Sequence, residues 1–189
     1  VVAASSHKHA ADAARQLRIT YQSSTAVLDF AQAKPNGHAP DKPQGRTTDT
    51  QRGSFEDGMR SGAVHIDAVY TTPIEHHNPM EPHAVSAHWD PDGPLLTMYD
   101  STQSPHGVAS TLAPVLGLET EQIRVIAPHV GGGFGSKGAP HAHDVLAALG
   151  AMHLPGRLVK YAVTRQQMFV FVGYRPRTVS PGASRTRSG

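Results

Sequence analysis

Residues 130–137 read Val-Gly-Gly-Gly-Phe-Gly-Ser-Lys and carry the strongest chemical signal in the sequence. Successive glycines can adopt positive φ angles and turn their N–H groups into one concavity, which suits a phosphate or an oxyanion. An expected strand precedes this segment and an expected helix follows it, so the helix dipole and the charge of Lys137 favour an anion. The segment lacks the spacing of a Walker A loop or of a dinucleotide-binding fingerprint. A glycine-rich turn without a ligand is the alternative.

Two other segments have side chains suited to binding. Residues 101–106 read Ser-Thr-Gln-Ser-Pro-His, so Gln103 stands where an expected strand ends and an expected helix begins. Its amide can both donate and accept a hydrogen bond. Residues 76–83 contain three histidines and one glutamate, but two prolines interrupt the spacing of a zinc site on a regular element. A rigid turn that enters a strand is the favoured interpretation, and a histidine-rich metal-binding protein is the alternative.

Composition excludes several kinds of site. The 189 residues include no cysteine, so this chain supplies no thiolate for zinc or for an iron–sulfur cluster. The formal net charge is only +2, but Asp144 is the last acidic residue and seven basic residues follow it. This asymmetry is typical of a basic tail, of an anion site, or of a segment cut from a longer protein. No apolar run approaches the ~20 residues that a membrane span needs.

The pattern of apolar residues predicts a mixed α/β chain of the α+β class. Residues 31–63 are rich in Pro, Gly and polar residues and are expected to form a linker. Residues 180–189 show no periodicity and are expected to be unstructured. The expected helices are 6–17, 104–117, 141–153 and 164–172, and the expected strands are 1–4, 17–21, 64–70, 83–89, 95–99, 123–127 and 158–163. Asp90 to Pro94 is expected to turn a hairpin between two of these strands.

Taken in order, five strings resemble the molybdenum-cofactor-binding subunit of the xanthine dehydrogenase / aldehyde oxidase family. The bacterial aldehyde oxidoreductase type is the most similar. The order and spacing match over residues 64–178, which makes the resemblance far more specific than any single motif. The matching strings are residues 75–83, 101–106, 116–118, 125–137, and 164–169 with 173–176.

The resemblance implies a division of the chain into four segments. Residues 1–30 are expected to form the C-terminal part of an α/β-hammerhead domain, and residues 31–63 the linker. Residues 64–178 are expected to form the N-terminal part of the molybdenum-cofactor-binding domain. Residues 179–189 would then be an unstructured tail.

The resemblance also implies roles for individual residues. Gln103 would donate a hydrogen bond to an oxo ligand of molybdenum, and Phe134 would help to wall the substrate pocket; both are expected at the catalytic centre. The segment that lies against the metal and its pterin would consist of Gly132, Gly133, Phe134 and Gly135. The expected cofactor is molybdenum–molybdopterin, which in this family can be the cytosine dinucleotide form. Iron–sulfur clusters and FAD would reside on partner subunits or domains.

The implied reaction is the oxidation of aldehydes or N-heterocycles with oxygen derived from water. The family's general-base glutamate lies in a Gly-x-Gly-Glu string, which this sequence does not contain. The glutamates at 75, 81, 119 and 121 do not match that string. We therefore expect a fragment that is inactive alone, with no membrane or nucleic-acid partner. The cytoplasm and the periplasm both remain open, because no signal is visible.

The main alternative is a non-enzymatic module that binds an anion or a nucleic acid. It would use the glycine-rich segment together with the basic C-terminal third. Aromatic residues make up only 6% of the chain, so stacking platforms for bases are scarce. The two hypotheses differ in one spatial expectation: a shared cofactor site requires Gln103 and the glycines of residues 131–133 to lie together.

Overall fold

The computed structural model describes residues 2–39, 50–93 and 95–186. The chain divides into two compact units that are interleaved along the sequence. The first unit comprises residues 1–19 and 75–175, and the second comprises residues 20–74 and 176–189. Among the helices in the described ranges, none combines the length and the apolar character that a bilayer span requires.

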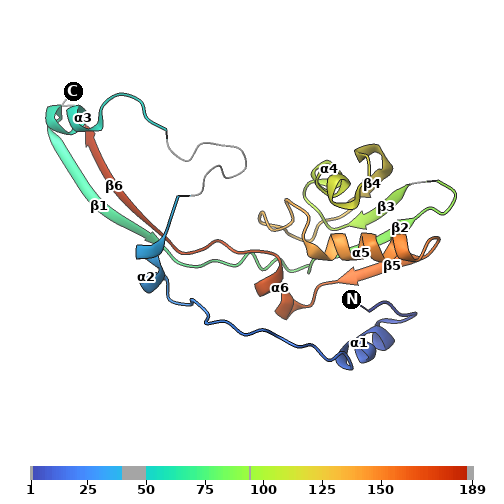
Figure 1. The fold of residues 1–189 in the computed structure, drawn as a ribbon. Helices are drawn as coiled ribbons and strands as arrows, with labels where there is room; N and C mark the ends of the chain where they lie inside the picture. Colours follow the sequence, from blue (N-terminus) through green and yellow to red (C-terminus); the bar gives the residue numbers. More distant parts are fainter. Residues whose placement is uncertain (1, 40–49, 94, 187–189) are drawn as a thin grey trace. The chain divides into compact units, whose positions relative to one another are not determined.

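The first unit is built on a four-stranded mixed sheet with the order β4-β3-β2-β5 (Figure 1). Strand β2 is antiparallel to both β3 and β5, whereas β3 and β4 run parallel. The expected hairpin is confirmed, because the N–H of Asp90 donates to the carbonyl of Leu95 at 3.0 Å. Pro94 of the expected turn lies outside the described residues. The strands are β2 (Ala84–Trp89), β3 (Leu96–Asp100), β4 (Ile123–Ile126) and β5 (Leu158–Ala162).

The helices of this unit begin and end where the sequence predicts. Gly117 closes α4 in the left-handed conformation with a φ of 69°, and Thr164 opens α6 with a capping box to Gln167. Helix α5 packs on β2 and β5, and α4 packs on β4 (Figure 1). Pro114 lies inside α4 without ending it. The elements are α4 (Pro105–Leu116), η3 (Thr120–Gln122), α5 (Ala142–His153) and α6 (Arg165–Phe171), with α1 (His7–Arg15) near the N-terminus.

The core lies between one face of the sheet and helices α4 and α5. Alternate residues of β2 and β3 are buried, as expected for a sheet with one covered face. Asp100 ends β3 on this covered face, two positions after the buried Met98. A carboxylate therefore enters the core beside the N-terminal turn of α5. The buried apolar residues of this core are Val85, Ala87, Leu96, Met98, Val108, Ala109, Leu112, Ala113, Ile123, Ala147, Ala148 and Ala151.

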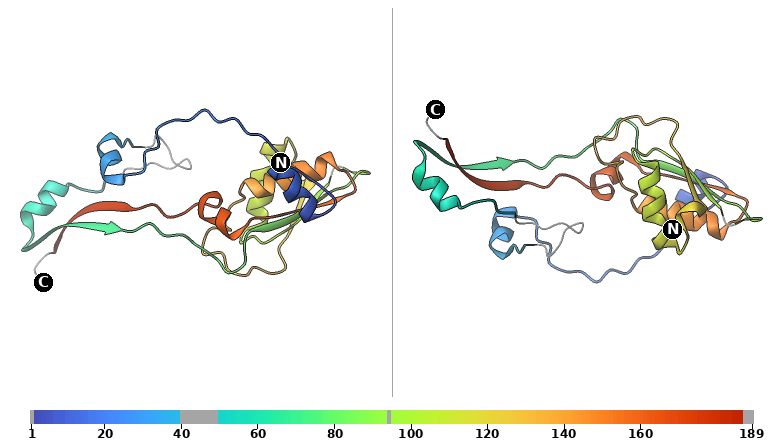
Figure 2. Two further views of the ribbon diagram at one scale, coloured as in Figure 1. Left: turned by 90° about the horizontal axis from the view of Figure 1, so that it is seen from below. Right: turned by 90° about the horizontal axis from the view of Figure 1, so that it is seen from above.

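The second unit contains a two-stranded antiparallel ribbon of β1 (Val64–Thr72) and β6 (Thr178–Thr186) (Figure 2). The expectation of an unstructured tail over residues 179–189 is wrong for residues 179–186, while 187–189 lie outside the described residues. Backbone hydrogen bonds to β1 define β6, and these require no apolar periodicity. Short helices accompany the ribbon: α2 (Phe30–Ala33), η1 (Lys34–Asn36) and α3 (Phe55–Ser61).

Near the N-terminus, two expected strands are absent. Residues 2–4 and 17–21 form no strand, although α1 lies between them as expected. The side chains of Leu17, Ile19 and Tyr21 are exposed, and a short apolar run is not a stable strand without a partner for its backbone groups. Residues 40–49 of the expected linker lie outside the described residues, and the predicted division into segments stays a prediction.

Candidate functional site

The glycine loop, residues 130–137, connects β4 to α5 and meets Gln103 at the end of β3. The N–H of Gly135 donates to Oε1 of Gln103 at 3.1 Å. The backbone N–H of Gln103 donates to the carbonyl of Lys137 at 2.8 Å. The expected convergence of the amide side chain and the glycine loop is therefore present in the structure.

Two glycines of the loop are required by close approach. A Cβ atom at position 133 would lie 2.4 Å from Oε1 of Gln103, and one at position 131 would lie 2.5 Å from Cβ of Glu81. Both distances are shorter than any normal contact. Backbone conformation constrains the other positions, because φ is 88° at Gly132, 53° at Phe134 and 93° at Gly135.

Among the described residues, several backbone donors of the glycine loop have no protein partner. Across the described ranges, the N–H groups of Gly132, Gly133 and Phe134 have no protein acceptor. Since its Oε1 accepts from Gly135, the Gln103 amide presents Nε2 as its remaining polar group. Phe134 is 72% exposed. The loop therefore offers neutral donors beside an exposed aromatic ring.

Glu81 and Lys137 form an ion pair beneath this loop. Nζ of Lys137 donates to Oε2 of Glu81 at 2.6 Å, and the same oxygen accepts from the N–H of Gly131 at 2.6 Å. Desolvation raises the pKa of Glu81, but these two hydrogen bonds and the lysine charge outweigh it and leave the pKa lowered. Because the lysine side chain is only 1% exposed, its charge is not presented to an anion as the sequence suggested. Instead, Glu81 links the two ends of the loop.

The prolines of the histidine string form a turn that Arg165 holds. The guanidinium donates to Oδ1 of Asn78 at 2.8 Å, to the carbonyl of Pro79 at 2.6 Å and to that of Met80 at 2.5 Å. His76 packs against the rings of Phe169 and Tyr174. The part of the chain that the structure describes therefore shows a rigid turn here, and its metal-compatible group lies elsewhere.

A layer of buried polar side chains lies behind the glycine loop. The carbonyl of Ser136 accepts from Nε2 of His83 at 3.2 Å and from Nε2 of His141 at 2.6 Å. His143 packs edge-on against the ring of His83. The backbone N–H of His141 donates to Oδ2 of Asp144 at 2.8 Å, which caps α5. These contacts fix the end of the loop onto the first turn of the helix.

Burial raises the pKa values of the carboxyl groups in this layer and lowers those of the histidines. Desolvation raises the pKa of Asp100 to about 7, with a further rise from the Asp144 charge, and it raises the pKa of Asp144 to about 6. Desolvation lowers the pKa of His83 to about 4 and that of His143 to about 3. Both rings are therefore neutral at pH 7, so the 3.3 Å contact between His143 and Asp144 is not an ion pair.

Sequence reasoning found Gln103 and the glycine loop but missed the polar layer behind them. Glu81 was considered only within the histidine string and as a glutamate that does not match the general-base string. The acidic and basic members of the layer come from segments far apart in the sequence. They come together only because β2 pairs with β3 and because α5 packs against both strands.

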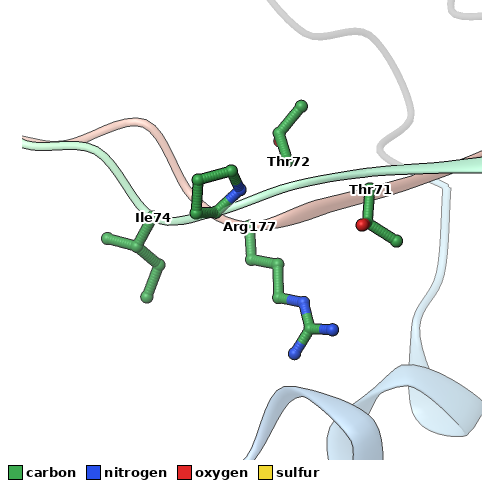
Figure 3. A pocket seen from close by; sticks show the side chains of 5 residues that line it. Thr71, Thr72, Ile74 and Arg177 are labelled. Atoms are coloured by element: carbon green, nitrogen blue, oxygen red, sulfur yellow. The ribbon is translucent and has the colours of Figure 1, made fainter.

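A pocket of about 400 Å³ lies in the second unit (Figure 3). Its wall includes Thr71, Thr72, Ile74 and Arg177, and the arginine guanidinium lies 5.6 Å from the ring centre of Phe30. This lining offers no acid–base pair. The residues with the strongest chemical character, Gln103 and the glycine loop, belong to the first unit.

Comparison with known protein families decides the ancestry of this fold. The family model described as "Molybdopterin cofactor-binding domain" matches residues 38–181. The chain belongs to this molybdopterin-binding family. The match covers both the glycine loop and Gln103, so the resemblance seen in the sequence is confirmed at the level of the family.

Individual members of the family are similar along nearly the whole chain. The aldehyde oxidoreductase molybdenum-binding subunit PaoC of Escherichia coli K12 is 35% identical over 179 residues, which is 95% of this chain and 24% of that protein. The carbon monoxide dehydrogenase large chain of Hydrogenophaga pseudoflava is 28% identical over 187 residues, covering 87% of this chain and 23% of that protein.

A solved structure shows the same arrangement of elements. Quinoline 2-oxidoreductase from Pseudomonas putida 86 superposes with a TM-score of 0.77 at 25% identity, over 97% of this chain and 24% of that chain. This molybdopterin-binding chain therefore spans about a quarter of the length of the relatives it matches.

Proposed function

We propose that this chain forms part of the molybdenum cofactor site of a hydroxylase that oxidises aldehydes or N-heterocycles with water-derived oxygen. The observation that carries the proposal is the hydrogen bond between Gly135 and Oε1 of Gln103, which fixes the amide beside the glycine loop. The amide is held in one orientation before any ligand binds. A preorganised neutral donor is well suited to an oxygen that carries negative charge.

The residues present fit a molybdenum–pterin group. At positions 131 and 133 the space that a Cβ atom would fill is taken by the side chains of Glu81 and Gln103, so the bare backbone lets the Gln103 amide lie directly against the loop. In the described chain, the N–H groups of Gly132, Gly133 and Phe134 remain without protein acceptors, as an anionic group requires. When bound, the group supplies hydroxylation of an electron-poor carbon and takes up two electrons.

The chain's own residues have separate tasks in this proposal. Gln103 donates through Nε2 to an oxygen of the cofactor, and the backbone N–H groups of residues 132–134 hold its anionic part. Phe134 excludes water and lines the substrate pocket. Glu81 and Lys137 act as positioning residues, because Glu81 accepts from both the N–H of Gly131 and Nζ of Lys137 and so holds the loop.

Further parts of the proposal follow from the family. Residues 1–30 correspond to the end of a hammerhead-like domain, and the cofactor is the cytosine dinucleotide form. Iron–sulfur and FAD partners receive the electrons. The chain alone has no turnover, because the Gly-x-Gly-Glu string is absent and Glu81 is bound to Lys137.

The basic C-terminal third gives little support to a nucleic-acid-binding module. Arg165 is bound to the turn of residues 78–80, Arg175 pairs with Glu75 at 3.3 Å, and Arg177 stacks on Phe30. These three side chains already have protein partners. Salt-sensitive binding of generic RNA by the purified chain, without affinity for molybdopterin, would favour that alternative.

The test is the cofactor content of variants of the complete protein, produced together with the cofactor-synthesis enzymes. Gln103→Ala is expected to lower the molybdenum and pterin content per chain by more than half, because the preorganised donor is lost. Gln166→Ala, an exposed amide on α6, is the matched control and is expected to have no effect. Equal cofactor content in both variants, together with unchanged turnover, would contradict the proposal.

A further inference from the structure

Asp100, His143 and Asp144 bring three potential ligand atoms together in the core of the first unit. Asp100 ends β3, and the other two lie in the first turn of α5. One ligand atom from each lies within 4.8 Å of the others, and all three residues are buried. Two carboxylates and an imidazole buried together are an unusual group, because buried acids are normally paired.

Two polar atoms in this cluster have no partner. Nε2 of His143 lies 3.3 Å from Oδ1 of Asp144, with the side chains 3% and 2% exposed. That contact is not a hydrogen bond, since within the described chain Oδ1 of Asp144 has no hydrogen-bond partner. Nδ1 of His143 is also without one. A buried acceptor without a partner is costly, so a missing cation would explain both the distance and the orphaned oxygen.

The contact distance suits two ligands of one metal ion. Two ligands bound about 2.1 Å from a tetrahedral zinc ion lie about 3.4 Å apart. We propose that Asp100, His143 and Asp144 bind one Zn²⁺ ion, which staples the end of β3 to the start of α5. The role proposed for this ion is structural. Its ligands are different residues from the glycine loop, which is proposed to hold the molybdenum cofactor.

The surroundings of the cluster favour zinc over harder cations. Oδ2 of Asp144 accepts from the N–H of His141 at 2.8 Å, which leaves Oδ1 as the free ligand atom. The nearby Lys137 charge is paired with Glu81 at 2.6 Å. Calcium needs six to eight oxygen ligands and magnesium retains several waters, whereas zinc accepts few ligands of mixed nitrogen and oxygen type.

The experiment removes bound metal from the 189-residue chain with EDTA and then titrates the chain with zinc by calorimetry. Metal analysis of the dialysed protein measures the zinc retained. The unaltered chain is expected to retain one zinc ion. His143→Gln is expected to weaken zinc binding by more than about tenfold. Removing a residue that only orients a metal ligand already weakens binding by about that factor, and removing the ligand itself should weaken it more. His153→Gln, at the exposed end of the same helix, is the matched control and is expected to bind zinc normally.

A second measurement keeps the proposal testable if His143→Gln does not fold. Cobalt replaces zinc in the unaltered chain and is expected to give the visible absorption of a tetrahedral ion with nitrogen and oxygen ligands. Absence of stoichiometric zinc binding would overturn the proposal. The cluster would then be explained by a proton that its two buried carboxyl groups share. Zinc binding that His77→Gln abolishes while His143→Gln leaves it unchanged would also overturn it, since the metal would then lie on the histidine string.

Discussion

Gly133 lies so close to the amide of Gln103 that a residue with a Cβ atom does not fit in its place. A Cβ atom there would lie 2.4 Å from Oε1, so the glutamine side chain must move and its hydrogen bond to Gly135 is lost. We predict that Gly133→Ala lowers stability by only about 1 kcal/mol, the usual worth of one hydrogen bond. Its molybdenum content in the complete protein is expected to fall by more than half.

The control is a glycine that has room for a methyl group. Gly93→Ala meets nothing within 4 Å and needs no positive φ, so its stability and cofactor content should match those of the unaltered protein. Chemical denaturation and metal analysis measure both quantities. A Gly133→Ala protein with full cofactor content would show that the position of the Gln103 amide is irrelevant to cofactor binding.

Glu81 neutralises a lysine that has almost no contact with water. Because Lys137 is 1% exposed and Glu81 is 38% exposed, Glu81→Gln leaves a buried charge without its counterion. We predict a loss of about 2 kcal/mol in the free energy of unfolding, which is below the full range for buried pairs because one partner is partly solvated. The double variant Glu81→Gln/Lys137→Met should recover most of it.

The pH dependence of this loss has a definite sign. The pKa of Glu81 is lowered in the folded chain from its ordinary value of 4.5, so the stabilisation is present above pH 4.5 and disappears as the pH falls through the lowered value. The difference between the unaltered chain and Glu81→Gln should therefore shrink in acid. A difference that grows as the pH falls would refute the assigned role of the pair.

At the scale of the elements, two reciprocal hydrogen bonds between side chain and backbone cap the start of α6. Oγ1 of Thr164 accepts from the N–H of Gln167 at 3.2 Å, and Oε1 of Gln167 accepts from the N–H of Thr164 at 2.9 Å. Thr164→Ala is predicted to cost about 1 kcal/mol. Thr164→Ser keeps the hydroxyl and should cost clearly less in the same denaturation experiment; equal losses would argue against capping.

Local signals in the sequence predicted the elements of the first unit well. The turn from Asp90, the helix end at Gly117 and the helix start at Thr164 lie where they were expected, and each has a short-range physical cause. The expected strands of the first sheet and β1 lie close to their predicted positions, whereas other strands were predicted wrongly. Residues 17–21 form no strand, whereas residues 178–186 form one by pairing with β1. β6 was missed because its residues show no apolar periodicity and its backbone hydrogen bonds to β1 do not require one.

The same limit explains what was missed in the site. Gln103 and the glycine loop could be found because each has an unusual local composition at the end of an expected strand. The contacts among Glu81, Asp100, Lys137 and Asp144 depend on which strands are neighbours in the sheet. That order, β4-β3-β2-β5, cannot be read from periodicity.

At the scale of the whole molecule, the two units differ in how much apolar surface they bury. The first has a continuous core, whereas nearly every residue of β1 is exposed. An isolated pair of strands is marginally stable in water. We predict that the amide hydrogens of β1 and β6 exchange at least tenfold faster than those of β2 and β3. Comparable protection in the two sheets would contradict this difference in local stability.

The central claim is that Gln103 and the glycine loop together hold an anionic, metal-bearing cofactor. The most direct test is a crystal structure of the complete protein with its molybdenum cofactor bound. The account predicts Nε2 of Gln103 at hydrogen-bond distance, about 3 Å, from an oxygen of the cofactor, with the loop N–H groups facing the same group. A cofactor bound away from the loop, with Gln103 turned to solvent, would contradict the account.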